Sequence, residues 1–431
     1  MKYSSISNVL DDKISGEWGL EPEGDDAIKI IRTTNFTNLG VLDFSNIVRR
    51  KINRNKIEQK KLLSGDVIIE KSGGSPSQPV GRVVYFHNPD NSIYLCNNFT
   101  TILRPNKSVI FPKFLFYVLF YNHLTKKTIR YQNKTTGIIN LQLEKYLNSK
   151  IPLPPLDDQI RIATILTRAE KLISKRKDSI KALDEFLKSS FLEMFGPSNK
   201  DFLSWPLVEI KDLAANHKGA MRTGPFGSNL LHSEFTATGD VAVLGIDNAV
   251  QNKFTWDERR FITKEKYSEL SNYRILPGDV IITIMGTIGR AAVIPDDIPL
   301  AINTKHLAAI TFDRQKANPQ FIAYSFHSSP YIKNQLASKN RGAIMNGLNL
   351  GLIKETKLRK PPIERQNQFA AIVEKVESLK SKYTQNLTEM ENLYGSLSQR
   401  AFKGKLDFII NYDFKYRRGK ELDNGEEENH D

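Results

Sequence analysis

The chain contains one sequence pattern twice. It reads IPLPPLDDQIRIAT at residues 151–164 and LRKPPIERQNQFAA at residues 358–371. Each copy has a Pro-Pro pair, an acidic residue, a glutamine and then a long run that favours helix. The two proline pairs are 207 residues apart in a chain of 431 residues, so the pattern divides the sequence into two halves of similar length.

Shorter matches follow the same order through both halves. They are Asn35 with Asn248, GDVII at 65–69 with GDVII at 278–282, Gly81-Arg82 with Gly289-Arg290, Asn97 with Asn303, and FPKFLFY at 111–117 with NPQFIAY at 318–324. Their offsets all lie between 206 and 213 residues. An ordered series at nearly constant spacing is the signature of an internal repeat, so we interpret the chain as two homologous halves.

The composition indicates a soluble globular protein. Hydrophobic residues make up 40% and charged residues 26% of the chain, and no apolar run reaches the roughly 18 residues that span a bilayer. The beginning, MKYSSISNVLDDKISG, lacks the apolar segment of a secretion signal, so we expect a cytoplasmic protein. Cys96 is the only cysteine, and the seven histidines lack zinc-binding spacing. We therefore expect no metal site, and Cys96 as a small core residue.

The charge balance favours a polyanionic partner. Lys and Arg number 62 against 48 Asp and Glu, which gives a formal net charge of +14. Nucleic acid is the first candidate, although many soluble proteins are basic for other reasons. The segment 411–431 ends in ELDNGEEENHD, which carries six acids and no Lys or Arg, and we expect it to be disordered.

Each half combines a globular part with a helical part. Residues 1–150 and 201–356 mix short β-rich runs, turns and one aromatic helix, which predicts two α/β (mixed α+β) domains. Residues 151–200 and 357–410 open with Pro-Pro, which precedes a helix well but cannot lie inside one. These two segments predict long helices, with Asp157 or Asp158 placed to cap the first.

Both predicted helices carry a heptad-like apolar stripe. The first stripe is Ile162, Leu166, Ala169, Ile173, Ile180, Leu183 and Leu187, with Arg176 at one seam position, and the second is Phe369, Ile372, Val376, Leu379, Tyr383, Leu387, Met390, Tyr394, Leu397 and Ala401. Such stripes must be buried. We expect an antiparallel pair that separates the two domains with pseudo-two-fold symmetry. The alternative is that each helix packs only on its own domain.

These features resemble a known family. The repeated Pro-Pro, Gln and long helix, the TGPFGSNL run at 223–230, and GDVII followed by Gly-Arg are similar to the specificity subunit of type I restriction-modification systems. The resemblance covers about residues 1–410 in the family order of recognition domain, helical region, recognition domain, helical region. The first domain departs from the pattern. It has GEWGLEPEGD at 16–25 in place of GPFGS, and no clear counterpart of Trp205-Pro206.

The resemblance implies a non-catalytic subunit that binds an asymmetric, two-part site in double-stranded DNA. Two separate methyltransferase subunits would dock on it and methylate adenine N6 from S-adenosylmethionine, on an adenine flipped out of the duplex. Restriction subunits, where present, would use ATP and Mg. The sequence agrees with this division of labour, because it contains no FxGxG cofactor loop, no NPPY-like tetrapeptide and no phosphate loop of the GxxxxGK[ST] type.

Base and phosphate contacts require Arg, Lys, Asn, Gln and close backbone approach on loops. The candidates in the first domain are Lys71, Ser72, Gly73, Gly74, Arg82, Asn97, Arg130, Asn133, Lys134 and Thr135. Those in the second domain are Arg222, Thr223, Gly224, Phe226, Gly227, Ser228, Thr287, Arg290, Thr304, Lys305, His306, Lys339, Arg341 and Asn346. The candidates for partner-subunit contact are Pro154, Pro155, Gln159, Pro361, Pro362 and Gln366.

Structural alternatives exist for several of these groups. SGGS at 72–75 is also a plain turn, and Phe226 is equally consistent with a packed core residue. The basic run at 49–61 fits a solvated helix face better than a base-reading element. Two other functions stay open. Asp201, Glu209 and Lys211 resemble the residues of a metal-dependent nuclease, and the repeat also fits a scaffold that joins two modules without DNA.

Overall fold

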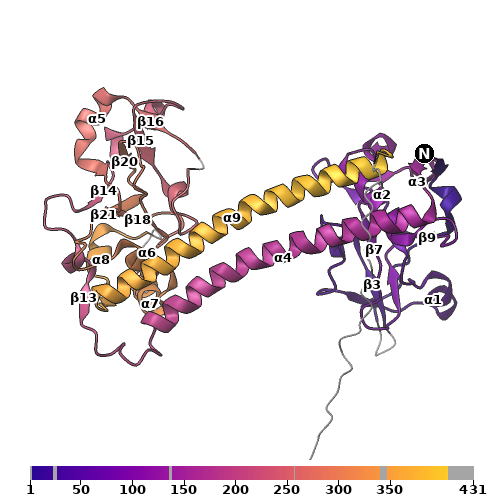
Figure 1. Cartoon of the computed structure of the whole chain (residues 1–431), viewed down its shortest axis with the longest axis horizontal. Helices are drawn as coiled ribbons and strands as arrows, with labels where there is room; N and C mark the ends of the chain where they lie inside the picture. Colours follow the sequence, from indigo (N-terminus) through magenta and orange to yellow (C-terminus); the bar gives the residue numbers. More distant parts are fainter. Residues whose placement is uncertain (1, 23–26, 135–137, 257, 340–346, 406–431) are drawn as a thin grey trace, which may run out of the picture. The chain divides into compact units, whose positions relative to one another are not determined.

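The computed structural model describes residues 2–22, 27–134, 138–256, 258–339 and 347–405 (Figure 1). The chain divides into two compact units, one made of residues 1–174 and 388–431 and the other of residues 175–387. The predicted acidic tail lies outside the described residues. Within the described residues, no helix is long and apolar enough to cross a membrane.

The first unit is a mixed α/β domain. Its strands are β1 Tyr3–Ser5, β2 Leu10–Ser15, β3 Ile28–Ile31, β4 Val48–Arg50, β5 Val67–Glu70, β6 Ser72–Gly74, β7 Val83–Tyr85, β8 Tyr94–Cys96, β9 Thr100–Pro105, β10 Gln132–Lys134, β11 Ile139–Leu141 and β12 Lys150–Pro152. Its short helices are α1 Arg54–Lys60, α2 Pro112–Leu124 and α3 Leu143–Leu147. The main sheet has the order β2-β9-β5-β7, and a second sheet has the order β4-β3-β8.

The second unit repeats this topology. Its strands are β13 Leu207–Glu209, β14 Met221–Thr223, β15 Val241–Leu244, β16 Phe261–Ile262, β17 Arg274–Ile275, β18 Val280–Thr283, β19 Ala291–Val293, β20 Ala301–Asn303, β21 Leu307–Ile310 and β22 Lys357–Arg359. Its shorter helices are α5 Lys264–Leu270, α6 Pro319–Ser328, α7 Pro330–Lys339 and α8 Leu350–Lys354. The main sheet β14-β21-β18-β19 matches β2-β9-β5-β7 strand for strand, and β16-β15-β20-β17 contains β4-β3-β8 with one strand added. The predicted repeat is confirmed.

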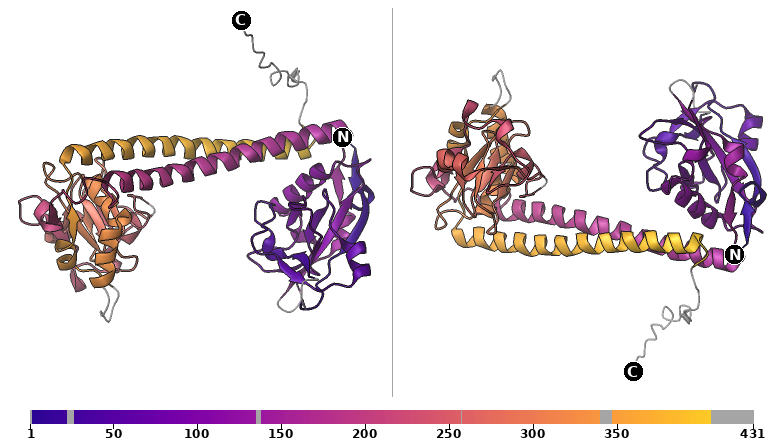
Figure 2. Two further views of the ribbon diagram at one scale, coloured as in Figure 1. Left: turned by 90° about the horizontal axis from the view of Figure 1, so that it is seen from below. Right: turned by 90° about the horizontal axis from the view of Figure 1, so that it is seen from above.

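In each unit, the chain enters and leaves the globular domain side by side. β1 pairs antiparallel with β12, and β13 pairs antiparallel with β22. Both views in Figure 2 accordingly show the N-terminus close to the beginning of the long helix that follows β12.

The repeated GDVII and aromatic segments supply each core. All four residues of β5 and all four of β18 are buried, which fits strands in the interior of a sheet. The aromatic helices α2 and α6 pack beside these strands, and Phe114 and Phe321 are almost completely buried in the two largest cores. Cys96 is fully buried in a smaller core of the first unit, as predicted, and burial raises the pKa of its thiol to about 11.

Two helices of 40 residues each follow the Pro-Pro pairs: α4 Leu156–Phe195 and α9 Ile363–Phe402. They pack together within each unit. In the first unit, the hydroxyl of Tyr394 donates a hydrogen bond of 2.9 Å to Glu170. In the second, Lys380 forms an ion pair of 2.5 Å with Asp184. The mixed fold with two homologous domains and a packed helix pair is confirmed.

The seam between the helices accommodates the one interruption of the stripe. The guanidinium carbon of Arg176 lies 4.1 Å from the centre of the Tyr383 ring, so the arginine stacks on a residue of the partner stripe. The helix ends also reach the domain cores. Leu166 and Phe402 belong to the core of the first domain, and Phe191 and Phe369 to that of the second.

The repeated glutamine fastens each long helix to its domain. The side chain of Gln159 accepts a hydrogen bond from the backbone N of Phe111 at 2.8 Å and donates to the carbonyls of Val109 and Pro154. Gln366 makes the same three bonds, to Asn318 N at 2.9 Å and to the carbonyls of Lys316 and Pro361. The glutamine therefore satisfies the backbone before the aromatic helix and the turn before the long one.

Candidate nucleic-acid interface

Three turns of the second domain meet at one end of its main sheet. β14 ends at Thr223 opposite Ala308, and β18 ends at Thr283 opposite Leu307. The turns at 224–228, 284–290 and 303–306 therefore share this end. The backbone of Ile284 also donates a 2.9 Å hydrogen bond to His306 O. Most of the second-domain candidates are brought together here.

The first domain has the same arrangement. β2 ends at Ser15 opposite Thr101, and β5 ends at Glu70 opposite Thr100. The segment 71–74 consequently lies beside the turn at 97–99, and Lys71 N donates a 2.9 Å hydrogen bond to Phe99 O. Residues 72–74 form strand β6 and pair with β11, so this segment is part of a sheet and not the plain turn that we considered.

The first domain does have a counterpart of the GPFGS motif. A Cβ on Gly16 would overlap the carbonyl of Asn97, and a Cβ on Gly224 would overlap the carbonyl of Asn303, its match in the repeat. Three residues later, Gly19 and Gly227 both have positive φ, at 72° and 63°. GEWG at 16–19 therefore corresponds to GPFG at 224–227, with an offset of 208 residues. We interpreted GEWGLEPEGD as a departure from the GPFGS pattern, and for the geometry of this turn that interpretation was wrong.

The aromatic residues in the two motifs are placed differently. Phe226 is 54% exposed at the tip of its turn, so it is not the packed core residue that we considered as an alternative. Trp18 is half-buried beside Ile30 and stacks against Arg50, whose guanidinium carbon lies 4.1 Å from the ring centre. The scaffold of the turn is thus repeated, while the surface that it presents differs.

Arg222 is part of this scaffold and not of the surface. It is buried and pairs with the buried carboxylate of Asp279, the aspartate of the second GDVII segment. In the first domain, Arg104 binds the equivalent Asp66 at 2.9 Å. Because the guanidinium of Arg222 is already committed to a buried internal partner, we withdraw it as a DNA contact.

Arg82 is also internal. Its side chain is only 11% exposed and makes two hydrogen bonds to Glu70, at 2.7 and 2.9 Å. It also donates to the carbonyls of Thr33 and Phe36. This arginine joins the end of β5 to the segment 33–36, so its donors are used inside the domain. We therefore withdraw it as a DNA contact as well.

Three further candidates lie in the interior. Asn97 and Asn303 are buried, and Asn303 donates a 2.9 Å hydrogen bond to Leu307 O, which stabilises the turn before β21. Gly74 is buried, and a Cβ there would collide with Val80. Gly224 is buried at the contact described above. These residues shape the turns, and the repeat kept Asn97 and Asn303 for a structural reason.

The remaining described candidates lie at least partly at the surface. Exposed are Gly73, Arg130, Asn133, Phe226, Gly227, Ser228, Thr287 and Arg290, and half-buried are Lys71, Ser72, Thr223, Thr304, Lys305 and His306. Thr135, Arg341 and Asn346 lie outside the described residues, and of Lys134 and Lys339 only the backbone is described.

Two of the half-buried candidates, Lys71 and His306, have lowered pKa values. Burial lowers the pKa of Lys71, whose ammonium donates a 3.0 Å hydrogen bond to Ser15 Oγ. Burial, with Lys305 and His232 nearby, lowers the pKa of His306. A histidine that is neutral at neutral pH both donates and accepts hydrogen bonds, which suits contact with a base edge.

The basic run at 49–61 and the nuclease-like triplet have structural partners. Lys56 and Lys60 on α1 form ion pairs with Glu17, at 3.1 and 2.8 Å. Asp201 pairs with Arg365 at 3.2 Å, and Glu209 pairs with Lys211 at 2.6 Å. In the described part of the chain, no group of three acidic, His or Cys side chains is arranged to hold a metal ion.

The Pro-Pro segments contribute only part of what we predicted. Gln159, Gln366 and Pro361 are buried, so they hold the fold and offer no surface to a partner. Pro155 and Pro362 are exposed. Pro154 and Pro155 line a pocket of about 590 Å³ with Leu153 and Ile162.

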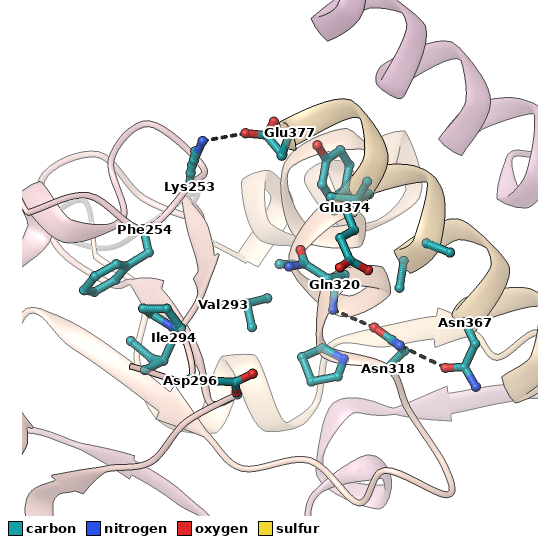
Figure 3. A pocket seen from close by; sticks show the side chains of 18 of the residues that line it. Lys253, Phe254, Val293, Ile294, Asp296, Asn318, Gln320, Asn367, Glu374 and Glu377 are labelled. Carbon is teal, nitrogen blue, oxygen red and sulfur yellow. Dashed lines mark hydrogen bonds and ion pairs between the residues drawn. The ribbon is translucent and has the colours of Figure 1, made fainter. Parts of the chain in front are cut away.

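A larger pocket, of about 750 Å³, lies between the second domain and the first turns of α9 (Figure 3). Asn318 bonds to Asn367 across its wall at 2.9 Å, and Lys253 pairs with Glu377 at 2.5 Å. Asp296 and Glu374 add two carboxylates. Lys253 and Arg314 line the same pocket, so its walls carry two cations beside three carboxylates. None of the residues predicted to contact DNA lines it.

Comparison with known proteins agrees with this architecture. The chain belongs to the family described as the type I restriction modification DNA specificity domain, whose model matches twice, over residues 20–182 and 204–390. The class of function that this family defines is recognition of DNA sequence in type I restriction-modification.

Individual relatives are distant in sequence. The chain is 24% identical to the specificity subunit of the type I restriction enzyme MjaVIII from Methanocaldococcus jannaschii, over 67% of this chain and 69% of that protein. It is 22% identical to the putative MjaX specificity subunit of the same organism, over 82% and 81%. The fold is similar to a chain from a type I R-M system (TM-score 0.58, 16% identity, 94% of this chain and 98% of that one) and to the type I S subunit from M. genitalium (TM-score 0.55, 14% identity, 93% and 96%).

Proposed function

We propose that this chain is the specificity subunit of a type I restriction-modification enzyme and that each of its domains reads one part of an asymmetric, two-part DNA site. The observation that carries the proposal is the repeated sheet end. Both domains keep the buried Gly and Asn that shape the turns, but the side chains at the surface differ: Phe226 is exposed in the second domain, whereas the equivalent Trp18 is half-buried in the first. Different surfaces on one scaffold suit two different half-sites.

The chain acts, in this proposal, without chemistry of its own. It binds duplex DNA and positions adenine-N6 methyltransferase subunits, two per chain, with restriction subunits added where the system has them. S-adenosylmethionine, ATP and Mg would be held by those partners. The paired long helices would set the distance between the half-sites.

Exposed apolar residues on the long helices support docking of a partner. α4 exposes Leu172 and Phe186, and α9 exposes Leu379 and Leu393 at the matching repeat positions. Leu379 is 36% exposed, so its predicted place in the buried stripe was wrong. Leu172 and Leu379 are 207 residues apart, as are Phe186 and Leu393. Equivalent apolar side chains left in water at equivalent registers fit two copies of one partner.

Mapping of methylated adenines tests the recognition role. A host that carries this chain with its methyltransferase is compared with a strain that lacks this chain alone. The expected result is a two-part motif with an unspecific spacer, methylated on both strands and lost in the deletion. An unchanged methylation pattern in the presence of assembled, active methyltransferase would refute the proposal and favour a scaffold without DNA.

Copurification tests the docking surface. The double variant L172D/L379D places two charges on the exposed apolar positions, and it should lose the methyltransferase subunit while keeping its own fold. The control S174D/S381D puts the same two charges on neighbouring exposed positions of the two helices. Equal recovery of the partner with both variants would show that docking lies elsewhere.

A further inference from the structure

The Gly-Arg pair that follows each GDVII strand has different surroundings in the two domains. In the first domain, Arg82 is neutralised by Glu70, the last residue of β5. The equivalent last residue of β18 is Thr283, which has no charge. Its hydroxyl accepts a hydrogen bond from the backbone N of Arg290 at 3.0 Å, so the threonine shapes the turn but leaves the guanidinium without a carboxylate.

Arg290 is correspondingly directed to the surface. It is exposed, and among the residues that the structure describes its side chain has no hydrogen-bond or ion-pair partner. It lines a pocket of about 360 Å³ together with Thr287 from the same turn and Lys333 from α7. Lys333 is exposed as well, so two cations and a hydroxyl face one cavity.

His327 lines the same cavity. Burial, with Lys333 and Arg290 nearby, lowers its pKa to about 4, and its Nε2 atom is buried without a partner in the described structure. Two uncompensated cations around a neutral histidine form an environment that attracts an anion.

We propose that the cavity lined by Arg290, Lys333 and Thr287 binds one phosphate of the DNA backbone and that the first domain lacks this contact because Glu70 already occupies its arginine. The inference rests on the proposed DNA recognition. It adds that the two domains differ in how they contact the DNA backbone. The second domain is held to the backbone at the Gly-Arg turn, and the first is not. A guanidinium with a flanking ammonium and hydroxyl supplies the donors that a phosphodiester accepts.

The test measures the affinity of the full chain for a pool of mixed-sequence duplexes as salt is raised, because phosphate contacts do not depend on sequence. Each phosphate contact contributes about 0.9 to the slope of log affinity against log salt. Between about 50 and 200 mM salt, the affinity of the unmodified chain falls by a certain factor, and for R290A this factor should be about 3.5 times smaller. K333A should show a reduction in the same direction.

The matched control is R314A. Arg314 is also exposed, but it lies after the opposite end of β21, beside Gly278 at the start of the GDVII segment. It carries the same charge outside the proposed cavity, so its removal should leave the slope unchanged. T283E gives the second domain a carboxylate at the position that Glu70 has in the first. This carboxylate should neutralise Arg290, so T283E should reproduce the effect of R290A while the arginine is still present.

The outcomes separate the inference from the function on which it rests. If the unmodified chain binds no duplex, the proposed function fails. If it binds with a steep salt dependence and R290A has the slope of R314A, only the phosphate site is refuted. Titration with inorganic phosphate identifies the source of the anion. Saturable uptake that R290A abolishes, together with an unchanged DNA slope, would reassign the cavity to a free phosphate and overturn the proposal.

Discussion

Glu170 on α4 and Tyr394 on α9 are joined by a hydrogen bond of 2.9 Å, in which the tyrosine hydroxyl donates to the carboxylate. Tyr117 of the aromatic helix α2 donates to the same carboxylate at 2.6 Å. One acidic group thus connects three helices of the first unit. Burial raises the pKa of this carboxyl above its ordinary value.

The shift predicts a pH dependence of stability. Because the folded state holds the proton of Glu170 more tightly than the unfolded state, the contribution of this group to the free energy of unfolding falls as pH rises through and above about 4.5. E170Q cannot ionise, and its amide oxygen can accept from one tyrosine hydroxyl while its amide nitrogen donates to the other. The difference in unfolding free energy between E170Q and the unmodified chain should increase from pH 4 toward pH 7 in favour of E170Q. A difference that is constant with pH would contradict the assignment.

Loss of the glutamine at the start of a long helix should be costly. Q366A leaves the partly buried backbone N of Asn318 and the buried carbonyl of Pro361 without their partner, so we expect destabilisation of about 2–3 kcal/mol in urea unfolding. Gln368 lies two residues later on the exposed face of α9. Q368A should change the unfolding free energy by less than about 0.5 kcal/mol, and similar values for both variants would argue against the buried hydrogen bonds.

The two residues Arg222 and Phe226 should have opposite phenotypes although they lie in one motif. R222A strands the buried carboxylate of Asp279, and we expect a loss of about 3–5 kcal/mol of stability. F226A removes an exposed ring, so stability should change by less than about 0.5 kcal/mol. Its affinity for the target duplex should fall about tenfold or more, as for an aromatic anchor at an interface. Denaturation and DNA-binding titrations on the same samples distinguish the two effects.

Glycine substitutions test the shared turn. G16A and G224A each place a Cβ against a backbone carbonyl, which must displace the turn, so each should weaken recognition of one half-site. Gly395 in α9 has open space around it. G395A should therefore raise the unfolding free energy, by about 0.5–1 kcal/mol, as expected for Ala in place of Gly inside a helix. Unimpaired methylation of both half-sites by G16A and G224A would contradict the role of these turns.

The helical part of the fold could be predicted from sequence because its signals are local. Pro-Pro, the acidic first turn and a heptad stripe define where a helix begins and which face it buries, and the Arg176 interruption was visible as well. The function of Gln159 and Gln366 was not visible. Their partners lie about 50 residues earlier in the chain, and no rule of spacing relates a helix start to the backbone of another helix.

The site was predicted less well, for a physical reason. The sequence around a loop arginine is the same whether the arginine binds DNA or a buried carboxylate. The carboxylate that binds Arg222 belongs to Asp279, 57 residues away, so the pairing was not visible in the sequence. Glu70 lies only 12 residues from Arg82, but on the other strand of a hairpin. The match of GEWG with GPFG was missed because only two of the four residues are identical. The spacing of Gly, aromatic and Gly at the repeat offset was present in the sequence and would have identified it.

The strand pairs β1–β12 and β13–β22 make each globular domain easy to exchange as a unit during evolution. Each globular domain begins and ends on neighbouring strands. In the second unit, this places the junction with α4 next to the junction with α9, and in the first it places β1 next to the junction with α4. Genetic recombination that exchanges everything between those junctions replaces one reading surface in a single event and leaves the helices and the other domain intact. In the function proposed above, such an exchange would change the DNA target and leave the surfaces for partner subunits unaltered.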